Sequence, residues 1–399
     1  MKKRISIFWY GHVFPLNSGT GMVVYQLSKY LHKVCGADVT LVSVANGKRQ
    51  ADEKYNEICS RYVELSMPGR LNFWRLTSAI FSRMRMLSVI GALTARGLRK
   101  SFLRECGRSD FFVINFSAFF ALLPRAILKE RALVVTHDIM FYRITSFVGQ
   151  ETWLKRLWIR LNKKIEVAVL KKFRYVGVLA DYEKKLLVEA GISAEKIVVL
   201  GLPMDPPPLV PSSGPKKYDF LMVASSLRQN EMGVKMFFEK VAPLLTGRNV
   251  TMAVAGSVCK TNVWDELSIP PNFTVNRLGY VDDLDAVFAE AKIGIGVLPC
   301  GSGVKVKVVE SVMRGLPMIL SNHGAEGISL TAEGSINIDR LSPDEVRKRI
   351  LEWLENPVKA VEDGALQARK VRTLFSPPVA LRDFGKCVCG QYENYSLMR

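Results

Sequence analysis

The 399-residue sequence contains no uninterrupted apolar run of the roughly eighteen residues that a membrane-spanning helix needs. The longest candidate, residues 111–123, is interrupted by Asn115 and Ser117 and ended by Pro124. The basic start at residues 2–4 is followed by an apolar segment too short for a secretory signal. We therefore expect neither a spanning helix nor a secretory signal.

Cysteine is scarce, and its pattern does not suggest a disulfide framework or a metal site. The chain has seven cysteines, an odd number, and only Cys387 and Cys389 lie close together in the sequence. A single C-x-C pair is weak evidence for a bound metal. We expect reduced thiols, as in a cytosolic protein.

Acidic residues are few relative to basic ones, and the imbalance is local. The formal net charge is +19. Residues 1–205 carry 33 Lys and Arg against 16 Asp and Glu, whereas residues 206–399 carry 23 against 21. The N-terminal half is therefore expected to face an anionic partner or a negatively charged surface.

The order of elements predicts an α/β protein of two domains, because short apolar runs alternate with helical patterns throughout the chain. A proline-rich stretch, 206–215, holds five of the eighteen prolines and is typical of a linker. We expect one domain at 1–205 and a second at 216–370. Residues 371–399 form a C-terminal segment without a clear role in a sheet.

The most informative stretch runs from Pro299 to Gly327. An apolar strand, 293–298, leads into the loop Gly301-Ser302-Gly303, and residues 304–314 have a helical pattern that a glycine and a proline end. A strand, a glycine loop and a helix start together direct free backbone N–H groups at a bound anion. Two lysines add positive charge to the first turns.

This stretch resembles the donor-site motif of retaining GT-B glycosyltransferases, in particular the family 4-like members of group 1. The matching residues, in order, are Gly301-Ser302-Gly303, Lys305, Lys307, Val309-Glu310-Ser311, Gly315-Leu316-Pro317 and Gly324-Ala325-Glu326-Gly327. The resemblance implies two Rossmann-like, doubly wound domains that face each other across a cleft. It also implies a nucleotide diphospho-sugar as donor, with the C-terminal domain binding the nucleotide.

The resemblance assigns roles to individual residues of this motif. It implies that Glu310 binds the ribose hydroxyls. It also implies that the diphosphate is held by Lys305, Lys307 and the loop from Gly301 to Val304. Ser302 stands where many members carry a second glutamate. How the donor sugar itself is held therefore stays open.

Three further positions belong to the candidate site by their place in the chain. The first strand leads into a polar loop with Gly19 and Gly21, which the family brings close to the donor phosphates, although an ordinary turn is the alternative. His137 directly follows a strand, where open α/β sheets bind ligands, and the family places a catalytic-site histidine near the donor sugar there. Arg228, after the first strand of the second domain, is a phosphate contact by resemblance.

Two helical stretches in the N-terminal half are basic and amphipathic, which is a pattern of membrane-surface helices. Residues 71–106 have an apolar stripe opposite Arg85, Arg96, Arg99 and Lys100, and residues 153–174 include Lys163 and Lys164. We expect this domain to bind a glycan or lipid-linked acceptor at an anionic membrane. The enzyme would then be cytoplasmic and peripheral, on the inner face of the membrane. A solvated basic face that serves solubility is the alternative.

The expected function is sugar transfer in the synthesis of cell-surface polysaccharides or glycoconjugates, with no cofactor and no metal. Asp283-Leu284-Asp285 has the D-x-D form that binds metal in the other major glycosyltransferase fold, but its place at a predicted helix start favours a capping role. A nucleotide-sugar 2-epimerase shares the GT-B fold and is an alternative. A nucleic-acid-binding protein would interleave basic and exposed aromatic residues, which this chain does not do.

Overall fold

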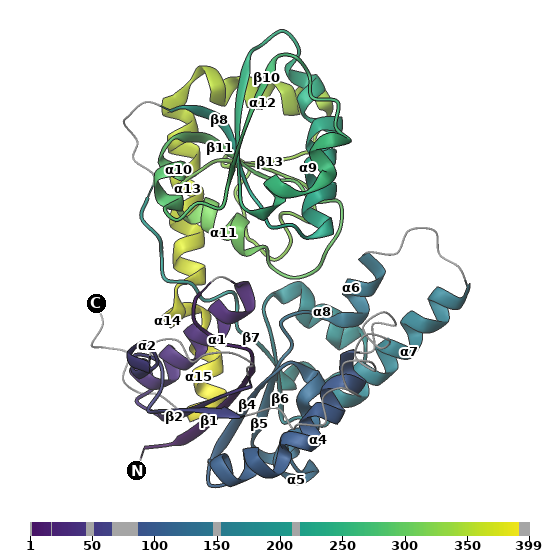
Figure 1. The fold of residues 1–399 in the computed structure, drawn as a ribbon, viewed down its shortest axis with the longest axis vertical. Coiled ribbons are helices and arrows are strands. Elements are labelled where there is room, and N and C mark those ends of the chain that lie inside the picture. The colour runs from purple at the N-terminus through teal and green to yellow at the C-terminus, as the bar shows by residue number, and fades with distance from the viewer. Residues whose placement is uncertain are drawn as a thin grey trace. The chain divides into compact units, whose positions relative to one another are not determined.

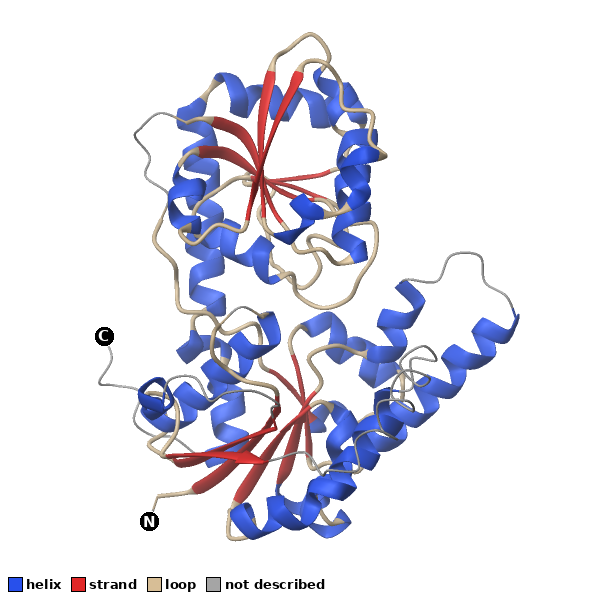
Figure 2. Ribbon diagram, viewed as in Figure 1, coloured by secondary structure: helices blue, strands red, loops and turns tan. Residues whose placement is uncertain are grey.

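A computed structural model describes residues 2–16, 18–44, 52–65, 87–146, 153–209 and 216–390. The chain folds into two compact units, one of Met1–Met204 with Phe375–Arg399 and one of Asp205–Leu374 (Figure 1). Each unit contains one parallel sheet flanked by helices (Figure 2). The predicted α/β class with two doubly wound domains is confirmed.

The first sheet has the strand order β3-β2-β1-β4-β5-β6-β7, and all of its pairings are parallel. Its most central strands are buried on both faces, as parallel sheets covered by helices require. The strands are β1 (Arg4–Tyr10), β2 (Asp38–Val44), β3 (Arg61–Leu65), β4 (Phe111–Asn115), β5 (Ala132–Val135), β6 (Tyr175–Val178) and β7 (Ile197–Val199).

Helices cover both faces of this sheet. Figure 1 shows α4 and α5 on one side of the strands and α1 and α15 on the other. The helices are α1 (Gly19–Lys29), α2 (Asp52–Asn56), α4 (Leu87–Cys106), α5 (Arg125–Arg131), α6 (Met140–Ser146), α7 (Trp153–Leu170), α8 (Asp181–Glu189), α14 (Pro377–Ala380) and α15 (Arg382–Cys389). A π-helical turn, Tyr30–Val34, extends α1, and Ser117–Leu122 forms a 3-10 helix after β4.

The second sheet has the order β10-β9-β8-β11-β12-β13, again with all pairings parallel. The strands are β8 (Tyr218–Val223), β9 (Val250–Ala255), β10 (Phe273–Gly279), β11 (Ala291–Gly296), β12 (Met318–Leu320) and β13 (Ser335–Asn337). The helices are α9 (Arg228–Lys240), α10 (Leu284–Ala289), α11 (Val306–Met313), α12 (Pro343–Glu355) and α13 (Pro357–Phe375).

Two predicted helix starts were wrong by a few residues, for identifiable reasons. The first helix begins at Gly19 rather than after Gly21, because the Ser18 hydroxyl accepts the N–H of Gly21 and caps the helix there. The helix of the motif begins at Val306, and Lys305 precedes it in an extended conformation. Lys305 therefore lies in the loop rather than in the first helical turn.

The basic stretch 71–106 is described only from Leu87 onward, as α4. Leu98 and Phe102 of its apolar stripe are fully buried in the core, while Arg96, Arg99 and Lys100 are exposed. Arg85 and the N-terminal part of the stripe lie outside the described residues. In the described residues we find no helix with the length and hydropathy of a membrane span.

Candidate active site

The loop between β11 and α11 has the backbone form that an anion site requires. Gly301 and Gly303 adopt φ angles of 121° and 78°, a region that side chains disfavour. The residue at the N-cap of α11 is Lys305, and no side chain caps the helix. The first N–H groups of α11 thus have no side-chain acceptor, which is the condition under which a helix start binds a phosphate.

Two predicted phosphate contacts, Arg228 and Lys305, come from different elements and both act electrostatically on Cys300, the residue before Gly301. Arg228 is the first residue of α9 and is exposed. Burial raises the pKa of the Cys300 thiol, and the positive charges of Arg228 and Lys305 oppose that rise. Both cations therefore act on the same thiol, which directly precedes Gly301.

The side chain of Lys305 is held against its own loop. Its ammonium group donates to the carbonyl of Gly303 and lies 3.5 Å from the carboxylate of Glu326. Glu326 belongs to the Gly-Ala-Glu-Gly segment of the motif but was not among the predicted site residues. Both side chains are largely buried, so this pair fixes the position of the ammonium beside the glycine loop.

Glu310 lies one turn into α11, where its carboxylate accepts a hydrogen bond from Lys307 at 2.9 Å. The Lys307 side chain is 50% exposed and that of Glu310 is 16% exposed. An i,i+3 pair of this kind adds only a few tenths of a kcal/mol to a helix, about 0.5 at most. The pair therefore leaves Glu310 free to exchange its partner.

A buried serine that the sequence did not reveal joins the two loops of the motif. Ser321 directly follows β12. Its hydroxyl donates to the carbonyl of Leu298 at 2.6 Å and accepts the N–H groups of Leu298 and Gly324 at 2.8 and 3.1 Å. A Cβ at Gly324 would lie 1.8 Å from the Gly296 carbonyl oxygen. The only sequence signal was a polar residue between an apolar strand and a glycine.

In the first unit, His137 follows β5 and is fully buried, with a φ of 59°. The amide Nδ2 of Asn115 donates to the Phe8 carbonyl at 2.8 Å, so its Oδ1 faces His137 Nε2, also at 2.8 Å. Nε2 must therefore carry the proton, and Nδ1 is the bare nitrogen. Burial lowers the pKa of His137 to about 3, which keeps the ring neutral.

Three ring nitrogens near the carboxyl ends of β1 and β5 lack a hydrogen-bond partner among the described residues. They are Nε1 of Trp9, Nε2 of His12 and Nδ1 of His137. The rings of Trp9 and His137 lie 6.0 Å apart, and Phe116 stacks on Trp9 and contacts His137 with its ring tilted. Buried polar groups without partners are rare, so these atoms are candidates for contacts with a bound ligand.

The loop after His137 is anchored by a residue that sequence reasoning missed, Glu166 of α7. Its carboxylate accepts the N–H groups of Met140 and Phe141, at 3.0 and 2.9 Å, and so caps the start of α6. Burial raises the pKa of this carboxyl to about 7. The available signal was an acid in a helix whose other charges are all basic.

The remaining predicted site residues occupy these places. Gly19 and Gly21 form the first turn of α1, and a Cβ at Gly21 would lie 2.8 Å from the Ser18 hydroxyl that caps it. Ser302 and Val304 lie in the loop between β11 and α11. Lys163 and Lys164 lie on α7.

The D-x-D segment caps a helix, as predicted. Asp283 accepts the N–H groups of Asp285 and Ala286 at 3.0 and 3.2 Å, and Asp285 forms an ion pair with Arg314 at 2.7 Å. In the described part of the chain, no three His, Cys, Asp or Glu side chains are grouped in a way that could hold a metal ion.

Residues 217–356 match the model of the family described as Glycosyl transferases group 1. The chain has the GT-B fold, and the family match lies within its second unit. Sucrose-phosphate synthase from Thermosynechococcus elongatus is structurally similar, with a TM-score of 0.70, 13% identity, and coverage of 96% of this chain and 98% of that one. No protein with a curated description matches the sequence.

Two other GT-B structures are similar over almost the full length of this chain. HepE from Anabaena, solved in complex with UDP-glucose, has a TM-score of 0.67, 12% identity, and coverage of 97% of this chain and 100% of that one. The lipopolysaccharide outer core galactosyltransferase WaaB has a TM-score of 0.58, 12% identity, and coverage of 96% and 99%. At these identities the likeness shows the fold.

Proposed function

We propose that this protein is a glycosyltransferase, which transfers a sugar from a nucleotide diphospho-sugar to a glycan or lipid-linked acceptor. The observation that carries the proposal is the ammonium group of Lys305 held beside the glycine loop before α11, with Glu310 one turn further on. The loop amides and this ammonium group suit a diphosphate leaving group, which gains charge as the glycosidic bond breaks. The HepE complex with UDP-glucose makes UDP-sugars the first donors to test.

The same arrangement supports a reaction without metal, since cations and helix amides can balance the charge of the diphosphate. Glu310 would accept hydrogen bonds from the ribose hydroxyls. Retention at the anomeric carbon follows from the resemblance of the motif. The unpartnered nitrogens of Trp9 and His137 would contact sugar hydroxyls.

The acceptor is proposed to be presented at the cytosolic face of a membrane, in the synthesis of a surface polysaccharide or glycoconjugate. The positive N-terminal half and the exposed Arg96, Arg99 and Lys100 support an anionic surface as partner. WaaB, which is named a lipopolysaccharide outer core galactosyltransferase, has the same fold. Charge reversal at these three residues should weaken binding to anionic vesicles and leave donor hydrolysis unchanged.

The experiment that tests the donor is a thermal-shift screen against UDP, GDP, ADP, CMP and dTDP sugars, followed by a transfer assay with the radiolabelled donor that stabilises the protein. Release of nucleotide with labelled sugar on an acceptor supports transfer, and an EDTA arm tests the metal. Appearance of an epimerised sugar without transfer would instead indicate a 2-epimerase. Absence of any stabilising nucleotide sugar would contradict the proposal.

A further inference from the structure

Helix α7 carries a row of exposed apolar side chains. Trp153, Leu157 and Leu161 are four residues apart, so they lie on one face of the helix. They are 71%, 58% and 44% exposed, respectively. Single exposed hydrophobic residues are common, but three in a row over about 12 Å of helix form a surface patch that marks an interaction site.

The core-facing side of α7 is separate from this row. Val167, Val169 and Leu170 are buried in the hydrophobic core of the first unit. Glu166, also buried, uses both carboxylate oxygens to cap α6. Among the residues of α7 whose burial is described, the buried ones begin at Glu166, so the exposed row lies on the N-terminal part of the helix, ahead of the part that packs on the core.

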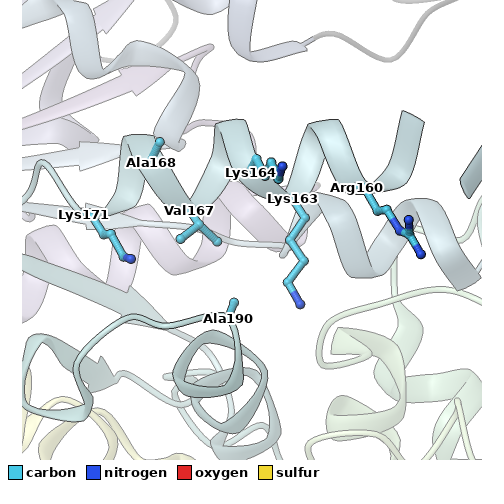
Figure 3. A pocket seen from close by; sticks show the side chains of 7 residues that line it. All are labelled: Arg160, Lys163, Lys164, Val167, Ala168, Lys171 and Ala190. Atoms are coloured by element: carbon cyan, nitrogen blue, oxygen red, sulfur yellow. The ribbon is translucent and has the colours of Figure 1, made fainter. Parts of the chain in front are cut away.

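Unpaired positive charge lies beside the row. A hollow of about 430 Å³ is lined by Arg160, Lys163, Lys164, Val167, Ala168, Lys171 and Ala190 (Figure 3). None of its four cations forms an ion pair with another described residue, although Lys163 lies over the ring of Phe141 at 5.2 Å. Figure 3 shows Arg160, Lys163 and Lys171 extending from the same side of the helix.

This combination selects one occupant, the surface of an anionic bilayer. Interfacial helices place aromatic and leucine side chains among the lipid head groups while Lys and Arg reach the phosphates. A second copy of the chain would bring like charges together at the hollow. A nucleic acid would not account for the two exposed leucines.

We propose that α7 is a bilayer-interface helix, with Trp153, Leu157 and Leu161 inserted among the lipid head groups and the cations of the hollow on lipid phosphates. The inference deepens the proposed function, on whose membrane-presented acceptor it rests. Attraction by charge alone would be lost at high salt, whereas the inserted row should keep part of the protein bound to the membrane.

The test is co-sedimentation with vesicles of phosphatidylcholine and phosphatidylglycerol at low and high salt. The vesicle partition coefficient of the variant Leu157→Ser/Leu161→Ser should be at least tenfold lower than that of the wild type. High salt should release this variant from the vesicles completely. The matched control is Val358→Ser/Leu366→Ser, which removes two side chains on α13 that are 68% and 45% exposed. It should bind within twofold of the wild type.

A second readout follows Trp153 directly. Quenching by lipids brominated on the acyl chain should be stronger in the wild type than in Trp153→Phe. Equal binding of wild type and the α7 variant, equal losses in both double variants, or no quenching difference would overturn the inference. So would a lipid-free wild-type dimer that Leu157→Ser/Leu161→Ser dissociates, or wild-type binding to RNA that this variant abolishes.

The two proposals can fail separately, because vesicle binding needs no donor and donor hydrolysis needs no vesicle. If the protein binds vesicles as expected but turns over no nucleotide sugar, the interface helix is supported and the proposed function is rejected. Donor turnover without vesicle binding would reject only the helix.

Discussion

Lys307 and Glu310 form an ion pair within the first two turns of α11, with the ammonium nitrogen 2.9 Å from the carboxylate. A glutamate in such a pair is either a solvated partner of the lysine or, as the resemblance implies for Glu310, a ribose ligand. The geometry accommodates both, because a half-exposed lysine can swing away when a ligand arrives. Experiments on the two residues separate the interpretations.

Glu310→Gln should lower kcat/KM for the donor by about thirtyfold, with no change in the melting temperature. The amide cannot accept two hydroxyl protons as a carboxylate does, and the loss of a charge-assisted hydrogen bond costs about 2 kcal/mol. Steady-state kinetics and a thermal melt provide the measurement. Glu239→Gln, an exposed glutamate of α9, is the matched control. Unchanged kinetics in folded Glu310→Gln would remove Glu310 from the donor site.

Lys305→Ala and Lys307→Ala should differ. Lys305 is fixed by Gly303 and Glu326 and acts on Cys300 together with Arg228, so its loss should raise the donor KM tenfold or more. Lys307 is half exposed and pairs with Glu310, so its loss should change KM less than threefold. Nucleotide titration by calorimetry would check the same ranking. The reverse ranking would place the diphosphate on the other side of the helix start.

The comparison of these two lysines also shows what the sequence could predict. The motif from Gly301 to Gly327 predicted the strand, the glycine loop and the helix, because their backbone requirements are local. It did not predict that Lys305 lies before the helix and pairs with Glu326. That contact joins residues 21 positions apart, on two loops that the buried hydroxyl of Ser321 also links through Leu298 and Gly324.

The first unit shows the same limit. The parallel sheet could be predicted from short apolar runs between helical patterns, and His137 from its place after a strand. The contacts of His137 with Asn115, and of Glu166 with the start of α6, join residues about 25 positions apart or less but on different elements. Periodicity describes one element at a time and carries no information about such contacts.

His137 should stay neutral throughout the working pH range. Its folded pKa, about 3, lies below the ordinary value of 6.5, so it contributes no inflection to the pH–rate profile between pH 5 and 8. Below pH 6.5 the unfolded chain binds a proton that the folded one does not, so the fold loses stability as the pH falls. Nitrogen chemical shifts of the labelled ring between pH 5 and 8 would check this. A titration near 6.5 would contradict the buried, Asn115-bonded ring.

Asn115→Asp tests the contact between Asn115 and His137 independently. A carboxylate at Oδ1 would stabilise the imidazolium and raise the pKa of His137, because an opposite charge in hydrogen-bond contact favours the charged ring. The ring should then titrate at a measurably higher pH than in the wild type. Thr145→Val, at another polar side chain of this unit, should leave the ring unchanged.

Glu166 should make the first unit less stable as the pH rises. A carboxylate whose pKa is lowered by folding would have the opposite effect. Its folded pKa, about 7, lies above the ordinary 4.5, so the folded state binds the proton more tightly than the unfolded one. The free energy of unfolding should therefore fall between pH 4.5 and 7 and level off above, by about 1–3 kcal/mol. Glu166→Gln keeps one acceptor for the α6 amides but carries no charge, so its stability should not show this fall.

The measurement is the melting temperature of wild type and variant from pH 5 to 8, with Glu189→Gln on α8 as the exposed control. Parallel curves for wild type and Glu166→Gln would show that the carboxyl does not titrate in this range.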